Sequence, residues 1–170
     1  MSKIILKNNK SLVLKNVLIR KLHCLNLDDL EGEIKDFKHS LKKHRVKTFG
    51  PLITKCYGPN VHKDGRITAN YEIIIQAHDY LKYKSLFETR KSLNCGKCVY
   101  LRYSDEPEFM DFAFSKINMF ITENNLNTVG VTYNAYVEQD HKNVVFEIFK
   151  PLAPNSSQQY FDSKLKKVLP

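Results

Sequence analysis

The sequence predicts an α+β domain built from two tandem strand-helix-strand-strand repeats, with a largely antiparallel sheet and two helices on one face. Residues 46–50 (VKTFG) and residues 126–130 (LNTVG), 80 positions later, each close a predicted helix. An aromatic-Glu-Ile strand follows each of them, at residues 71–73 and at residues 146–148, 75 positions apart. Two copies of one unit in a single domain predict a pseudo-twofold fold with a cleft where the halves meet.

In the first half, a strand with a kink at Asn16 precedes a helix of about four turns. Asn26 or Asp28 can cap this helix, and the Gly-Pro pair at residues 50–51 ends it. The expected strands cover residues 11–22, 52–57 and 70–78. Apolar residues at steps of three and four predict a buried helix face of Leu27, Leu30, Ile34, Phe37 and Leu41.

In the second half, the turn residues 94–97 predict a hairpin that joins the two repeats. Pro107, with acids beside it, is typical of a helix start. The expected strands cover residues 86–93, 98–103, 131–138 and 144–149. The predicted buried helix face comprises Phe109, Ala113, Ile117, Phe120 and Ile121, widened by Met110, Phe112 and Phe114.

The composition is that of one ordered globular domain, with 170 residues of which 42% are hydrophobic. We expect the domain to cover residues 1–152, followed by a polar, basic tail at residues 153–170, with a short docked helix around residues 161–168 as an alternative. No apolar run approaches the roughly 18 residues of a membrane helix, and the first residues lack a signal-peptide core. We therefore expect a cytoplasmic protein without membrane insertion.

The four cysteines are expected to stay reduced in that compartment. Cys95 and Cys98 form a CxxC motif without a second pair at matching spacing, and they do not open a helix in a strand-helix-strand unit. We therefore expect neither metal nor redox chemistry at this motif, and no cofactor.

The formal charge of +9 raises the prospect of an acidic partner, a nucleic acid or a membrane surface. The basic residues are spread along the chain, and no helix-turn-helix or RNA-binding aromatic signature is present. We expect no direct nucleic-acid binding, and solubility is the simpler explanation for the charge.

Glu147 is the leading candidate for a binding residue. It is the one carboxylate in the apolar strand of residues 144–149, where Val145 and Phe149 flank it on its own face. Burying an unpaired charge is costly, so Glu147 must be partnered, be protonated, or face a wet or ligand-lined cavity. A carboxylate between apolar groups suits an aromatic or aliphatic cation.

Glu72 is the counterpart of Glu147 in the first repeat, but its strand alternates in the ordinary way, which predicts a solvated or rim position, with a ligand-binding place in the cleft as the alternative. Aromatic faces on strands can stabilise cations or planar ligands, and the alternative for each such residue is a place in the core. The candidate aromatic residues are Tyr71, Tyr100, Tyr133 and Tyr136. No GxSxG, HExxH or phosphate-binding glycine loop indicates catalysis.

These features together resemble the GyrI-like family, the effector-binding domain also found as the C-terminal part of BmrR-type transcription activators. The resemblance runs over residues 12–152 and depends on element order as well as on motifs. The motifs are Gly-Lys-Cys-Val at residues 96–99, Thr-Val-Gly at residues 128–130, and the closing strand FEIFKPL at residues 146–152, similar to the family's E-x-aromatic-x-P pattern.

The resemblance implies a ligand cleft between the repeats, in which an acidic residue of the last strand faces lipophilic cations. That role falls on Glu147, with Phe149 at the aromatic position. A hydrolase branch of the family, acting on cyclopropane-bearing drugs, has a cleft Trp; this chain has no Trp, which disfavours hydrolysis. The sequence carries no DNA-binding domain, so we expect a stand-alone member.

Two functional hypotheses follow. The first is a small-molecule-binding protein for lipophilic or cationic ligands, acting as a sensor or sequestering module. The second is an adaptor of the same fold that binds an acidic protein partner through its basic surface, with the cleft filled by side chains.

Overall fold

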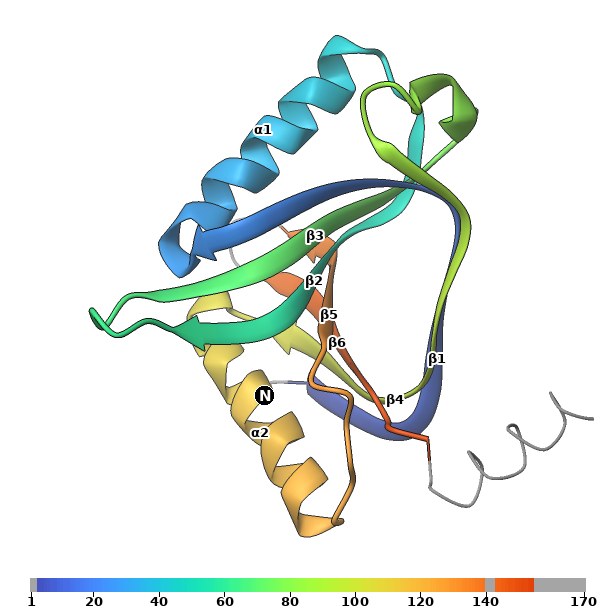
Figure 1. The fold of residues 1–170 in the computed structure, drawn as a ribbon. Helices are drawn as coiled ribbons and strands as arrows, with labels where there is room; N and C mark the ends of the chain where they lie inside the picture. Colours follow the sequence, from blue (N-terminus) through green and yellow to red (C-terminus); the bar gives the residue numbers. More distant parts are fainter. Residues whose placement is uncertain (1–2, 140–142, 155–170) are drawn as a thin grey trace, which may run out of the picture.

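Six antiparallel strands close into a barrel, and two helices lie along one side of it, in the computed structural model, which describes residues 3–139 and 143–154 (Figure 1). The order around the barrel is β1-β3-β2-β5-β6-β4. The strands are β1 (Lys3–Asn26), β2 (Thr48–Val61), β3 (Ile67–Ala77), β4 (Glu88–Asp105), β5 (Thr132–Gln139) and β6 (Val144–Pro151), and the helices are α1 (Leu30–Lys43) and α2 (Met110–Glu123). The predicted α+β class, antiparallel sheet and paired helices are confirmed, and closure into a barrel is an additional finding.

The internal duplication is visible throughout the described chain. Helices α1 and α2 each contain 14 residues and begin 80 positions apart. The antiparallel neighbours Thr54 and Asn134 are also 80 positions apart, so equivalent residues of the two repeats pair with each other. Such pairing places a pseudo-twofold axis between β2 and β5.

The predicted hairpin at residues 94–97 is wrong. Strand β4 runs through this segment and pairs with β1 on both sides of it, with Leu93 opposite Leu14 and Cys98 opposite Lys10. Gly96 has φ +70° and its N–H donates to the Asn94 side chain over 2.9 Å, so the turn residues form a bulge. Asn94 and Gly96 adopt a local turn-like geometry, but pairing with β1 on both sides keeps the strand continuous. The kink at Asn16 is confirmed by its φ of +54°.

The predicted helix faces pack on the barrel, apart from three exposed residues; their partly buried members are Leu30, Ile34, Met110, Phe114, Phe120 and Ile121. Phe37 and Leu41 are buried on α1, and Ala113 and Ile117 on α2. The prediction is wrong for three residues, which are exposed: Leu27, Phe109 and Phe112. Leu27 and Phe109 belong to short 3-10 turns before the helices. Phe112 lies about 100° around α2 from the buried Ala113. Asn26 does not cap α1; its side-chain amide donates to the Asp29 carboxylate over 3.0 Å.

Two layers of apolar side chains cover the barrel wall. The outer layer packs under the helices, around Phe37 for α1 and Ile117 for α2. The inner layer, which we call the interior core, receives side chains from every strand and therefore fills the barrel. Its buried members are Leu14, Val17, Ile19, Ile53, Ile74, Leu93, Cys98, Tyr100, Tyr133, Ala135 and Phe149.

In the described residues, neither helix has the length and apolar character needed to cross a membrane. The tail predicted beyond residue 154, with its alternative helix around residues 161–168, lies outside the described residues.

Replacing Phe37 with Ala should lower the free energy of unfolding by about 3–5 kcal/mol, because a fully buried aromatic ring is lost from beneath α1. Phe112→Ala is the matched control, since its ring is 65% exposed and its loss should change stability by no more than about 0.5 kcal/mol. Urea denaturation followed by circular dichroism measures both values. Equal losses would contradict the packing described here.

Candidate functional site

Two glutamates occupy equivalent positions on the inner wall of the barrel. Glu72 on β3 lies opposite Lys21 of β1, and Glu147 on β6 lies opposite Arg102 of β4. Two residues beyond each glutamate, Ile74 and Phe149 belong to the interior core, and alternate residues of a strand share a face. The strand register therefore directs both carboxylates inward, each beside a cation from the first strand of its own repeat.

Glu72 is the more deeply buried of the two, with only 3% of its surface exposed. Its Oε1 accepts a 2.7 Å hydrogen bond from the Tyr57 hydroxyl, and Arg90 approaches the same oxygen at 3.9 Å. The predicted solvated or rim position is wrong. The barrel closes over the face of β3 that carries Glu72, and apolar side chains fill its interior. The Lys55 ammonium lies 3.5 Å from Oε2, close enough for an ion pair, yet Oε2 receives no hydrogen bond among the described residues.

Lys55 is an unusually buried cation, with 13% of its side chain exposed. Its ammonium donates a 2.6 Å hydrogen bond to the Tyr57 hydroxyl and lies 5.6 Å from the centre of the Tyr133 ring. Partial burial and the hydrogen bond to Glu72 raise the pKa of Tyr57 to about 12. The hydroxyl thus stays protonated at neutral pH, accepts a hydrogen bond from Lys55 and donates one to Glu72.

A surface cavity of about 340 Å³, which we call the Glu72 cavity, opens beside this group. Glu88 forms ion pairs with two of its lining residues, Lys21 at 2.6 Å and Arg90 at 2.6 Å. Hydrogen bonding to Lys21 is the main cause of a lowered pKa for the Glu88 carboxyl. The lining residues are Lys21, Leu22, His23, Tyr57, Asn70, Tyr71, Glu72 and Arg90.

Glu147 has partners of its own, which is the first of the three states considered for it. Its Oε1 accepts hydrogen bonds from the Tyr100 hydroxyl at 2.6 Å and from Arg102 at 2.7 Å, and 15% of its side chain is exposed. Burial, followed by the hydrogen bond to Glu147, raises the pKa of Tyr100 above its ordinary value. Glu147 is therefore an ion-paired carboxylate and not an isolated charge.

A lysine of this chain occupies the aromatic surface next to Glu147. The Lys10 ammonium lies 3.5 Å from the centre of the Tyr100 ring and 5.7 Å from that of Phe149. The two rings pack against each other with centroids 5.0 Å apart. The position suited to a cationic ligand is thus held by an internal cation.

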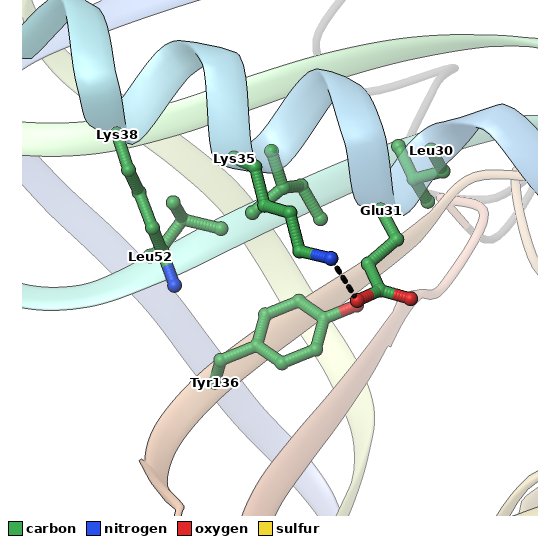
Figure 2. Close-up of a pocket in the computed structure, with 7 residues that line it drawn as sticks. Leu30, Glu31, Lys35, Lys38, Leu52 and Tyr136 are labelled. Carbon is green, nitrogen blue, oxygen red and sulfur yellow. Dashed lines mark ion pairs between the residues drawn. The ribbon is translucent and has the colours of Figure 1, made fainter.

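The structure brings together some of the predicted site residues and separates others. Tyr100, Tyr133 and Phe149 share the interior core, and Val145 lies two residues before Glu147 on the same face. Tyr136 instead packs against the outer α1 layer, and Tyr71 packs there while also lining the Glu72 cavity. Figure 2 shows Tyr136 in a separate groove of about 490 Å³ beside α1, near the Lys35–Glu31 ion pair of 2.7 Å.

The cations and the extra tyrosine of the two carboxylate groups were not foreseen. Lys21 and Arg102 occupy equivalent places in the two repeats, but only the strand register shows this, because their spacing of 81 matches neither the 80 nor the 75 of the repeated motifs. Lys10, Lys55 and Tyr57 carried no usable signal, since their approach depends on how distant strands pair.

No metal centre is evident in residues 3–139 and 143–154: no cluster of three or more His, Cys, Asp or Glu side chains there could hold an ion. The sequence matches no protein-family model, and comparison with the curated proteins finds no match.

Comparison with solved structures identifies the fold. The EcmrR C-terminal domain is 12% identical, with 91% of this chain and 99% of that chain covered and a TM-score of 0.61. The chain has the fold of that domain. An uncharacterized conserved protein from Listeria innocua is 10% identical, covering 89% of this chain and 92% of its own, with a TM-score of 0.50. SAV2435 bound to tetraphenylphosphonium is 14% identical, covering 89% and 94%, with a TM-score of 0.48. The shared fold agrees with the fold that the sequence resemblance predicted.

Removing the charge of Glu72 should destabilise the protein more than removing that of Glu147. Glu72→Gln leaves the Lys55 ammonium buried without its counter-ion and should cost about 3 kcal/mol of unfolding free energy. Glu147→Gln should cost about 1 kcal/mol, because Arg102 is 38% exposed and can turn to water. Chemical denaturation compares them, with Lys55→Met as a second substitution that should recover part of the loss in Glu72→Gln. Equal losses, or no recovery, would argue against a buried Lys55–Glu72 pair.

Proposed function

We propose that this chain is a small-molecule-binding domain whose principal site is the Glu72 cavity. The observation that carries the proposal is the Glu72 carboxylate: it is 3% exposed, lines a cavity of about 340 Å³, and has one oxygen without a hydrogen bond among the described residues. A buried oxygen in this state favours a ligand that supplies a donor. The shared fold is compatible with this role.

The lining defines the class of ligand. Leu22 and Tyr57 offer apolar and aromatic surface, while Glu72 offers a hydrogen-bond acceptor. Lys55 and Arg90 already balance much of the negative charge, so charge alone would attract a cation weakly. We propose a lipophilic molecule with an N–H donor, such as an aromatic amine, held by the domain in a sensing or sequestering role without catalysis.

A second proposed site is related to the first by the internal duplication. It comprises Glu147, Phe149, Val145, Tyr100 and Tyr133. Lys10 occupies it in this structure. A cationic ligand would have to displace this ammonium from the Tyr100 ring before contacting the aromatic surface. The second site is therefore proposed as the weaker one.

An adaptor function is the second candidate, and the filled interior is the observation that favours it. Tyr100, Tyr133 and Phe149 are all buried in the core where an open central cleft was expected. With a net charge of +9, such a domain could instead bind an acidic protein surface. Binding assays with small molecules separate the two functions.

Phenethylammonium should bind the parent protein and bind Glu72→Gln at least about tenfold more weakly, since the acceptor loses its charge. Isothermal titration calorimetry below the unfolding range of both proteins measures the affinities. Glu123→Gln, an exposed glutamate at the end of α2, is the matched control and should bind like the parent. The neutral analogue 2-phenylethanol should bind less tightly than the amine. Absence of binding by the parent to a panel of aromatic amines would remove the ligand-binding proposal and leave the adaptor.

Lys10→Met should raise the affinity for tetraphenylphosphonium roughly tenfold, because it vacates the Tyr100 and Phe149 rings beside Glu147. This probe is a bulky cation without N–H donors, so it tests the aromatic surface and not the donor site. Lys15→Met, at an exposed lysine of the same strand opposite Ser92, is the control for the loss of one surface charge. Equal affinities of the two variants would show that Lys10 does not occupy a cation site.

A further inference from the structure

The bulge in β4 places two thiols against each other. Along a regular strand, residues three apart face opposite sides, so Cys95 and Cys98 should point away from one another. Their Sγ atoms are instead 3.3 Å apart. The register explains this, since Lys97 pairs with Ser11 and Asn94 with Val13, which leaves two residues of β4 opposite one of β1. The positive φ of Gly96, +70°, accommodates the extra residue.

The two thiols differ in their access to solvent. Cys98 is fully buried in the interior core, whereas Cys95 is half-buried at its edge. The Cys95 Sγ lies 3.4 Å from the carbonyl oxygen of Leu12 on β1. A small reagent therefore meets Cys95 first, and Cys98 stands behind it.

Their protonation is unequal as well. The hydrogen bond with Cys98 lowers the pKa of the Cys95 thiol to about 7. The same interaction, followed by burial, raises the pKa of the Cys98 thiol. When one proton has left the pair, the negative charge thus rests on the accessible sulfur and the remaining proton on the buried one, which is the arrangement that a nucleophilic and a resolving thiol require.

We propose that Cys95 and Cys98 are a redox-active dithiol that a hydroperoxide oxidises to an intramolecular disulfide. The Cys95 thiolate attacks the peroxide, an S–O bond forms, the O–O bond breaks, and the leaving oxygen takes a proton. Cys98 then attacks the Cys95 sulfur; the S–S bond forms, the S–O bond breaks, and the Cys98 proton leaves with hydroxide as water. The two thiols are oxidised by two electrons and the peroxide is reduced to an alcohol, or to water, and a further water.

The geometry requires little movement for this step. Closing the bond shortens the Sγ–Sγ distance from 3.3 Å to about 2.0 Å. The bulge absorbs such a change more readily than a paired segment, because Cys95 and Gly96 lie outside the β1–β4 ladder, although Cys98 stays paired with Lys10. The remaining cysteines, Cys24 on β1 and Cys56 on β2, serve as internal references. The inference does not depend on the proposed ligand function.

Hydrogen peroxide added to a Cys24→Ser/Cys56→Ser protein should remove two hydrogen atoms from its intact mass. Tandem mass spectrometry should place the link between Cys95 and Cys98, and dithiothreitol should reverse it. In the unsubstituted chain the same link should form while Cys24 remains a thiol, which tests the dithiol without substitutions. Oxidation that reaches Cys24 first, or that carries Cys95 to a sulfinic acid without a disulfide, would overturn the proposal.

The roles of the two sulfurs are tested separately. Cys98→Ser should accumulate a sulfenic acid at Cys95 that dimedone traps, whereas Cys95→Ser should leave Cys98 unoxidised. Iodoacetamide should alkylate Cys95 with a midpoint near pH 7, as the lowered pKa of its thiol predicts. Circular dichroism confirms that each variant is folded. Dimedone labelling confined to Cys98 would show that Cys98 is the attacking thiol and would overturn the proposed roles of the two cysteines.

Discussion

The long antiparallel pairing of β1 with β4 is the constraint on which the rest of the structure depends. It runs from Lys3 opposite Ser104 to Ile19 opposite Glu88 and joins the two repeats along one side, while β2 and β5 join them along the other. Closing the sheet in this way gives every strand an inner face, and the apolar side chains on that face must pack together. Any charge carried inward then needs a partner supplied by the protein or by a ligand.

The two repeats meet this requirement in different ways. Position 55 of β2 pairs with Glu72 and is a lysine, whereas its equivalent in β5, Ala135, pairs with Glu147. Glu72 therefore forms an ion pair with a lysine of β2, whereas the ion pair of Glu147 is with Arg102 of β4. The difference between Lys55 and Ala135 thus makes the surroundings of the two carboxylates electrostatically unequal. Glu72, in the first repeat, is more deeply buried and accepts fewer hydrogen bonds than Glu147.

Bulges let the same pairing carry reactive groups at the edge of a packed interior. A strand without a bulge would turn either Cys95 or Cys98 toward the outside and separate them. Gly96 in the left-handed region brings both sulfurs to the interior side of β4, and β1 closes over them through Leu12. The packing of the barrel, the carboxylate groups and the thiol pair are therefore consequences of one strand pairing.

Local periodicity was enough to predict much of this molecule. The steps of three and four placed both helices, the repeated motifs established the duplication, and strand alternation put Val145, Glu147 and Phe149 on one face. Each of these properties depends on neighbours along the chain, which a sequence displays directly.

The sequence by itself thus determined the order of the elements, their doubling and the two equivalent glutamates. Only the tertiary structure decided that residues 94–97 form a bulge and not a turn, that Glu72 is buried, and that Lys10 and Lys55 lie against aromatic rings. These outcomes depend on which strands pair across long stretches of chain. Periodicity shows which face a side chain takes, but not which distant side chains it will meet when the sheet closes.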